Sequence, residues 1–190
     1  VRYPFGYGLS YTSFEYSDFE VNENGAGFTL KNTGAADGAE IAQLYIGKAD
    51  GKIFRPVREL KGFKKVFLKA GESARVEIPF DKRTFRYYNV KTNAWEEEGG
   101  RYEVSIGASS EDIRLHGEIH KTGTTETTPY VEELLPSYYA GKTADVGEKE
   151  FERLLGRKLP EAGYRFYKKN RMVIDENCTV ADLRYSKRWV

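Results

Sequence analysis

Few residues in this sequence have the type and spacing that metal or nucleophile chemistry requires. The two histidines, His116 and His120, lie four residues apart. On a strand that separation is about 13 Å, at roughly 3.3 Å per residue, which is too far for both rings to bind one metal ion. Cys178 is the single cysteine, and no histidine near it in the sequence could activate a thiolate. We therefore predict surface histidines and an unreactive thiol, with no metal site and no cofactor.

Carboxylates and glycines are the remaining candidates for chemistry. The three glutamates at 96–98 could pair as acid and base, but a charge run that leads into the glycines at 99–100 is more simply a solvated turn. Neither these glycines nor those at 6 and 8 have the strand, spacing and helix start of a phosphate-binding loop. We predict conformational glycines and no catalytic residue.

The charge balance argues against two classes of partner. Thirty Lys and Arg oppose 29 Asp and Glu, so the net charge is +1 and no global field attracts nucleic acid or an anionic membrane. Residues 164–171 interleave aromatic and basic side chains as a nucleic-acid site can, but the surrounding sequence is nearly neutral. No apolar run approaches the roughly 18 residues that span a bilayer. We expect neither a nucleic-acid nor a membrane partner.

Alternating apolar and polar residues predict the elements that carry these side chains. Seven short strands with long polar connections at 48–57 and 81–93 are typical of a two-sheet antiparallel sandwich. The first strand shifts phase near Asp18, which indicates a bulge or an end there. We expect Trp95 to enter the strand of Tyr102 and to be at least partly buried. The predicted strands cover residues 14–21, 28–32, 41–46, 59–68, 74–80, 102–106 and 113–119.

The composition changes after residue 120, so we predict an all-β sandwich over residues 1–120 and a partly helical extension over 121–190. Residues 122–128 are rich in Thr and read as a linker or an extended edge. Helices are predicted at 129–135, 148–155 and 179–187. The middle helix carries an apolar stripe of Phe151, Leu154, Leu155 and Leu159, and we expect residues 129–159 to dock on the sandwich.

Several motifs resemble one known domain. The opening residues 3–12, Tyr-Pro-Phe-Gly-Tyr-Gly-Leu-Ser-Tyr-Thr, are similar to the start of the fibronectin type III-like domain of glycoside hydrolase family 3 enzymes, the β-glucosidases and β-xylosidases. The resemblance continues through residues 42–46, 59–63, 100–102 and 107–110, and it covers about residues 1–118.

This resemblance implies an accessory sandwich attached to a barrel domain and an α/β sandwich domain that share the active site. The family is a retaining one, with an Asp nucleophile on the barrel, commonly in a Ser-Asp-Trp stretch, and a separate acid/base carboxylate. Ser17, Asp18 and Phe19 match that stretch superficially, but they lie on the first predicted strand. The resemblance therefore assigns no catalytic residue to this chain.

The extension resembles the connector of family members of inverted domain order, in which the barrel follows the sandwich. Residues 135–139, 151–157 and 179–183 carry this likeness. The chain starts at Val1 rather than Met and ends within a periodic segment, so we expect a fragment of a longer protein. We expect the parent to be a bacterial-type enzyme and its location to be cytoplasmic.

Two functional hypotheses follow. In the first, the chain is a non-catalytic accessory domain that packs on the barrel and α/β sandwich domains of its parent chain. Its expected interdomain contacts are Tyr3, Phe5, Gly6, Tyr7, Tyr11, Phe151, Leu154 and Leu155. In the second, it is a carbohydrate-binding module in which Tyr87, Tyr88 and Trp95 or Phe54 offer ring faces to a sugar.

Overall fold

The computed structural model describes residues 2–48 and 50–159. It divides into two compact units, Val1–Val146 and Gly147–Val190, and each is described by itself. The predicted helix at 179–187, the aromatic and basic segment 164–171 and Cys178 lie outside the described residues.

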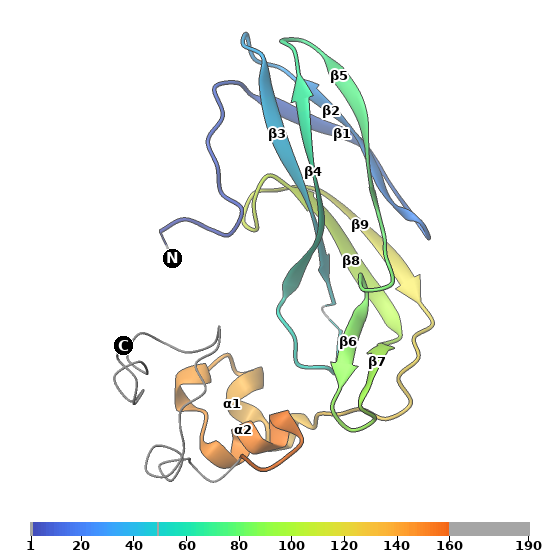
Figure 1. The fold of residues 1–190 in the computed structure, drawn as a ribbon, viewed down its shortest axis with the longest axis vertical. Coiled ribbons are helices and arrows are strands. Elements are labelled where there is room, and N and C mark those ends of the chain that lie inside the picture. Colours follow the sequence, from blue (N-terminus) through green and yellow to red (C-terminus); the bar gives the residue numbers. More distant parts are fainter. Residues whose placement is uncertain (1, 49, 160–190) are drawn as a thin grey trace, which may run out of the picture. The chain divides into compact units, whose positions relative to one another are not determined.

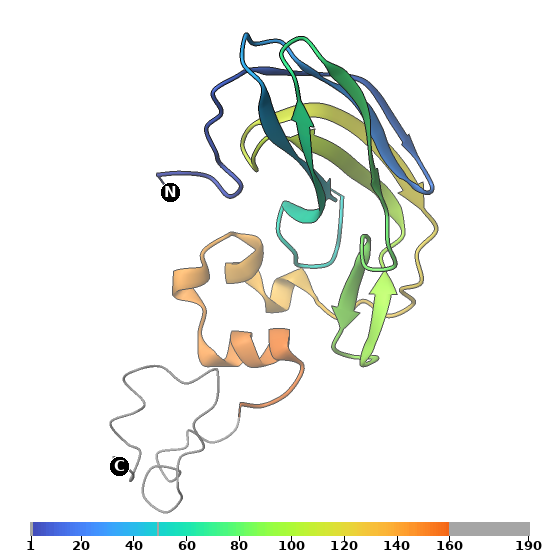
Figure 2. The same ribbon diagram turned by 45° about the horizontal axis from the view of Figure 1, so that its top comes forward.

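The described part of the chain forms two antiparallel sheets and a hairpin (Figures 1 and 2). One sheet has the order β1-β2-β5 and the other the order β4-β3-β8-β9, while β6 pairs with β7 alone. The all-β antiparallel sandwich predicted from the sequence is confirmed. The strands are β1 (Phe14–Asn22), β2 (Gly25–Asn32), β3 (Gly38–Gly47), β4 (Arg58–Leu68), β5 (Ser73–Pro79), β6 (Arg86–Asn89), β7 (Ala94–Glu97), β8 (Gly100–Gly107) and β9 (Ile113–Lys121).

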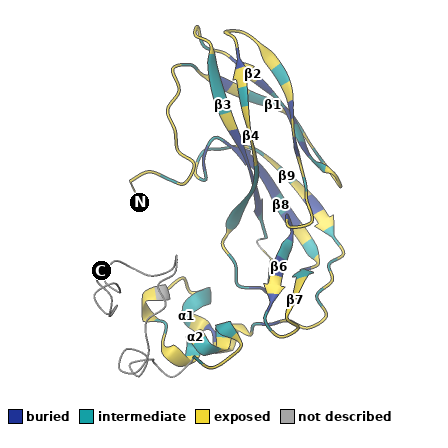
Figure 3. Cartoon of the chain, in the orientation of Figure 1, coloured by how far each residue is buried: buried dark blue, intermediate teal, exposed yellow. Residues whose placement is uncertain are grey.

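The core forms because alternate side chains of each sheet point toward the other sheet. In β2, buried and partly exposed residues alternate over most of the strand, and Phe28 lies opposite Val76 of β5. In the second sheet Leu44 lies opposite Ile106. Figure 3 shows the buried positions along both sheets. At roughly 25 cal/mol per Å² of apolar surface, this burial is the main stabilising contribution. The core residues are Phe14, Ala26, Phe28, Leu30, Ala42, Leu44, Ile46, Leu68, Val76, Ile78, Phe85, Tyr102, Val104, Ile106 and Ile119.

The predicted strand break near Asp18 is a bulge in β1. The register with β2 shifts between Ser17 and Glu20, and Asp18 has a φ of 51°. The Arg75 guanidinium donates to the Asp18 carbonyl oxygen at 2.7 Å. Asp18 itself is exposed on this edge strand.

The hairpin of β6 and β7 is absent from the sequence-based prediction, and it makes the expectation for Trp95 wrong. Trp95 is 65% exposed and lies opposite Tyr88 in the hairpin. The strand of Tyr102 does not extend back to Trp95, because β7 ends at Glu97 and β8 begins at Gly100, whose φ is 114°. With four residues each, β6 and β7 are too short for alternation to reveal them.

The Thr-rich segment after β9 is an extended edge rather than a free linker. The backbone N–H groups of Thr124 and Thr125 donate to the Glu97 carbonyl oxygen at 2.7 and 3.1 Å. The Asn89 side-chain amide donates to the Thr127 carbonyl oxygen at 2.8 Å. These bonds fasten the segment to the β6–β7 hairpin.

The helix predicted at 129–135 lies a few residues later than expected. A 3₁₀ turn at Glu132–Leu134 leads into α1 (Pro136–Tyr139), and a second 3₁₀ turn follows at Thr143–Asp145. Pro136, not Pro129, occupies the first helical turn. Leu135 is buried, and the Tyr139 hydroxyl donates to the Lys52 carbonyl oxygen at 2.6 Å. This part of the extension packs on the sandwich, as expected.

In the second unit, α2 (Glu148–Leu155) has the predicted bounds and ends at Gly156, whose φ of 74° is the usual left-handed helix end. The docking of Phe151, Leu154 and Leu155, and the division of the chain at residue 120, stay predictions. Within the described residues, no helix combines the length and apolar character that crossing a membrane requires.

One end of the sandwich is held by the buried side chain of Asn32. Its amide nitrogen donates to the carbonyl oxygens of Ala36 and Leu68, at 2.9 and 3.1 Å. Its amide oxygen accepts from the Thr12 hydroxyl at 2.6 Å and from the Gly34 N–H at 3.1 Å. All four hydrogen-bonding positions of the amide are therefore used.

We expect Asn32→Ala to lower the free energy of unfolding by about 1–3 kcal/mol, because it leaves buried carbonyl oxygens and a hydroxyl without partners. Urea denaturation of the chain measures this. Lys31→Ala, at the exposed neighbouring position on β2, is the matched control and should change stability by less than about 0.5 kcal/mol. Equal midpoints for the two variants would contradict the role of Asn32.

Candidate functional site

The first candidate site is the segment before β1, residues 3–12, which we call the N-terminal arm. It begins with a tight turn in which the Tyr7 N–H donates to the Pro4 carbonyl oxygen at 3.1 Å. Gly6 has a φ of 78°, as the third residue of a type II turn requires. A Cβ at this position would also overlap the Gln43 side-chain amide. Glycine is needed at position 6 for both reasons.

Gln43 of β3 fixes the arm to the sandwich. Its amide nitrogen donates to the Gly6 carbonyl oxygen at 3.1 Å and to the Ala108 carbonyl oxygen at 2.6 Å. Its amide oxygen accepts from the Tyr45 hydroxyl at 2.6 Å. The Ser110 N–H adds a bond to the Phe5 carbonyl oxygen at 2.9 Å. The backbone of the arm is therefore tied to β3 and to the β8–β9 turn.

The aromatic rings of the arm point away from this anchored backbone. Tyr3, Phe5, Tyr7 and Tyr11 are all exposed, as is Leu9. The rings of Tyr3 and Tyr7 stack with centroids 5.2 Å apart. The structure thus brings the predicted arm residues Tyr3, Phe5, Gly6 and Tyr7 together, with Tyr11 further along the same segment. Their contact with another domain stays a prediction.

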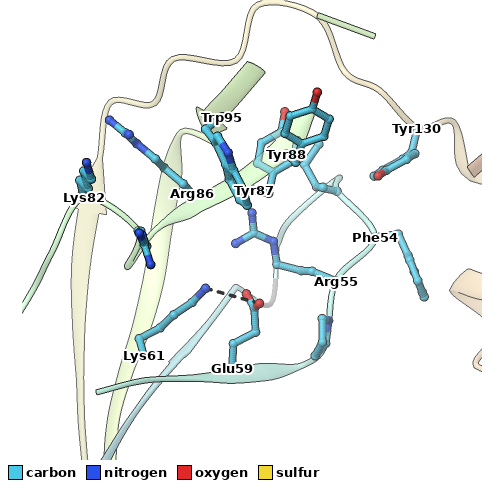
Figure 4. Close-up of a pocket in the computed structure, with 13 residues that line it drawn as sticks. Phe54, Arg55, Glu59, Lys61, Lys82, Arg86, Tyr87, Tyr88, Trp95 and Tyr130 are labelled. Atoms are coloured by element: carbon cyan, nitrogen blue, oxygen red, sulfur yellow. Dashed lines mark ion pairs between the residues drawn. The ribbon is translucent and has the colours of Figure 1, made fainter. Parts of the chain in front are cut away.

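The second candidate site is a pocket of about 740 Å³ beside the β6–β7 hairpin, which we call the aromatic pocket (Figure 4). Its volume lies within the range of small-molecule sites. The four aromatic residues predicted to contact a sugar all line it. The lining residues are Ile53, Phe54, Arg55, Pro56, Glu59, Lys61, Lys82, Arg83, Arg86, Tyr87, Tyr88, Trp95 and Tyr130.

The four predicted aromatic residues differ in how exposed their rings are and in what those rings contact. Trp95 and Tyr88 are exposed and pack edge to face, with ring centroids 5.6 Å apart. Tyr87 is nearly buried, and its hydroxyl lies 2.9 Å from the Thr125 hydroxyl. Phe54 packs against Tyr138 of α1, with ring centroids 5.0 Å apart. Trp95 and Tyr88 are therefore the rings best placed to meet a ligand.

Buried ionisable groups support the wall of the pocket. The Arg55 guanidinium lies 5.5 Å from the Tyr87 ring centroid and 6.0 Å from that of Tyr102. The Tyr102 hydroxyl donates to the Glu98 carbonyl oxygen at 2.7 Å, and burial raises the pKa of Tyr102 to about 12. Burial also raises the pKa of Tyr87. Both phenols are therefore neutral at physiological pH.

The glutamate run has a different role from the solvated turn predicted for it. Glu98 is buried, and its carboxylate accepts from the Lys52 N–H at 2.6 Å, which positions the loop that carries Arg55. A hydrogen bond from the Thr92 hydroxyl lowers the pKa of Glu96 most, followed by one from Asn89. Glu97 lies 3.7 Å from Arg86. The prediction of a solvated run is therefore wrong for Glu98.

The two histidines lie outside both candidate sites. His116 and His120 are exposed, as predicted, and His116 lies 3.1 Å from Glu103. No group of three or more His, Cys, Asp or Glu side chains in the described part of the chain could hold a metal ion. Sequence reasoning missed the roles of Gln43, Arg55 and Glu98, because nothing in their sequence neighbourhoods separates them from other polar residues.

Comparisons with known proteins agree with the resemblance. Residues 40–110 match the fibronectin type III-like domain family. The chain is 47% identical over 127 residues to probable β-glucosidase K of Emericella nidulans, a match that covers 66% of this chain and 15% of that protein. It is 45% identical over 139 residues to exo-α-(1→6)-L-arabinopyranosidase of Bifidobacterium longum. That match covers 70% of this chain and 18% of the Bifidobacterium protein.

Among solved structures, the chain is similar to the family 3 β-glucosidase of Bifidobacterium adolescentis, with a TM-score of 0.62 and 41% identity. That match covers 70% of this chain and 20% of the enzyme. The chain thus spans about 15–18% of the length of the curated relatives above. The relatives include fungal as well as bacterial proteins, so the likeness does not support a bacterial type in particular. The chain contains a fibronectin type III-like domain of the kind found in glycoside hydrolase family 3 β-glucosidases.

Proposed function

We propose that this chain is a non-catalytic accessory domain of a family 3 β-glycosidase and supports the catalytic domains by packing against them. The parent enzyme would remove terminal β-linked glucose or xylose with retention. The observation that carries this proposal is the N-terminal arm, whose backbone is fixed by Gln43 while its rings are exposed. The cytoplasmic location expected from the sequence stays a prediction.

The arm continues an apolar face of the second sheet. Gln43, which holds the arm, lies opposite Phe63 of β4. Ile41, two residues earlier on β3, shares this face, because side chains two apart on a strand point the same way. Ile41, Phe63 and Phe67 are all exposed. Large contiguous apolar surfaces mark interaction sites, so we infer that this face and the arm contact the rest of the parent chain.

A preordered arm favours such a contact energetically. Each long side chain ordered on association costs roughly 0.5–1.5 kcal/mol, and flexible backbone costs more. The bonds from Gln43 and Ser110 already order the backbone of the arm in this domain. Packing of the rings would therefore gain burial at the cost of side-chain entropy alone, since the backbone is already ordered.

Carbohydrate binding is a second candidate function, and the exposure of Trp95 favours it. The predicted burial of this ring would have assigned it to the core. Instead Trp95 and Tyr88 present ring surface at a pocket of ligand size. Sugar rings stack on such aromatic faces, so this candidate stands beside the packing role rather than replacing it.

We expect the isolated chain to turn over no aryl β-glucoside, β-xyloside or α-arabinopyranoside, because retaining hydrolysis needs two carboxyl groups about 5–5.5 Å apart across a sugar pocket. Spectrophotometric release of nitrophenol by the pure chain is the measurement. Activity that disappears in Asp18→Asn would overturn the non-catalytic assignment.

We expect the triple variant Tyr3→Ser, Phe5→Ser, Tyr11→Ser to leave the isolated chain as stable as the wild type, within about 0.5 kcal/mol per site, since these rings are exposed here. In the full-length parent the same variant should lower the unfolding temperature, because it removes interdomain burial. Differential scanning calorimetry measures both. Val57→Ser, an exposed apolar position away from the arm, is the control. An unchanged full-length protein would refute the packing role of the arm.

A further inference from the structure

The aromatic pocket has a strongly asymmetric charge. Five basic side chains and one acidic side chain line it, in a protein whose net charge is +1. Lys61 lies 3.4 Å from Glu59, and Arg86 lies 3.7 Å from Glu97. These two cations are therefore partly compensated.

Three other cations line the pocket, and one of them, Arg83, has the Asp81 carboxylate nearby, which accepts from its backbone N–H at 2.7 Å. Arg55, Lys82 and Arg83 form no ion pair with a carboxylate of the described residues. The Arg55 Nε and Nη2 atoms are buried and donate to no acceptor within that same part of the chain. Figure 4 shows the Arg55 side chain extending into the middle of the pocket, below Trp95 and above Glu59 and Lys61. Buried N–H groups without an acceptor are costly, so an oxyanion that reached these two atoms would gain strong hydrogen bonds.

Rings and cations therefore converge on one small volume. Trp95 and Tyr88 offer apolar faces to the carbon side of a sugar ring, while Lys82 and Arg83 lie exposed on the turn before β6. A neutral sugar would stack on the rings but would form no ion pair with the cations of the pocket. A ring that carries a carboxylate would use both, because charge-assisted hydrogen bonds are roughly twice as strong as neutral ones.

We propose that the aromatic pocket binds an acidic sugar, a pyranose ring that carries a carboxylate, with Trp95 as the stacking platform and Arg55, Lys82 and Arg83 as the cationic groups. This inference rests on the second candidate function, carbohydrate binding, and is independent of the packing role of the N-terminal arm.

The test is isothermal titration calorimetry of the chain with two matched ligands, methyl β-D-glucoside and methyl β-D-glucuronide, which differ only in the carboxylate at C6. The sandwich has its own core and the size of an autonomous domain, so the chain is a suitable sample. We expect the acidic ligand to bind at least about tenfold more tightly, and this advantage to shrink between about 50 and about 300 mM salt. Equal binding of both ligands would overturn the acidic preference and leave carbohydrate binding standing. Binding of neither would refute both.

Variants separate the two contributions. The double variant Lys82→Gln, Arg83→Gln should lower the affinity for the acidic ligand alone. Trp95→Ala should lower the affinity for both ligands by about tenfold or more. Lys65→Gln, an exposed cation of β4 outside the pocket, is the matched control and should change neither affinity. Circular dichroism confirms that each variant is folded. If the full-length parent failed to bind the acidic ligand while this chain bound it, another part of the parent would occupy the pocket, which would overturn the proposal.

Discussion

The Asn32 side chain is the interaction on which the arrangement of one end of the sandwich depends. It joins the turn after β2, the end of β4 and the start of β1, three segments that are distant in sequence, through four hydrogen bonds. Hydrophobic burial brings the two sheets together but does not specify how their ends are closed. A buried amide with every position satisfied does specify it, because any other arrangement leaves polar groups without partners.

A comparable network closes the opposite end, where β8 begins. Here the Tyr102 hydroxyl and the Lys52 N–H both donate to Glu98, through its carbonyl oxygen and its carboxylate respectively. The Tyr102 ring also lies between two cations, with Lys48 Nζ at 5.0 Å and the Arg55 guanidinium at 6.0 Å from its centroid. The long loop after β3 is thereby held against the sandwich. The aromatic pocket exists because this loop is fixed.

The sequence predicts those features of this fold that depend on local periodicity. Alternation in β2 and β8 identifies half-buried strands, the apolar run at 41–46 identifies the more buried β3, and Gly156 marks the end of α2, because each signal involves neighbours in sequence. The β6–β7 hairpin escapes prediction because four residues do not establish a period. Gln43 and Glu98 escape it for another reason: each bonds to backbone atoms 37 or more residues away, and a backbone partner leaves no trace in residue type. The four aromatic candidates line one pocket, but the exposure of Trp95 depends on where a strand stops.

A single unpaired residue in β4 separates the two candidate sites. Leu44 of β3 lies opposite Gly62, and the next residue, Tyr45, lies opposite Leu60, so Lys61 is the extra residue of a bulge. Before the bulge Glu59 lies opposite the buried Ile46, and after it Phe63 lies opposite Gln43, beneath the N-terminal arm. Because side chains alternate with a period of two, Glu59 and Phe63, four residues apart in sequence, would share one face of a regular strand, and the extra residue places them on opposite faces. A strand of this sequence without the bulge could not offer Phe63 and Phe67 to the face of the arm while turning Glu59 toward the aromatic pocket. The bulge is thus the local feature that lets one small sandwich carry an apolar docking face and a cationic, ring-lined pocket.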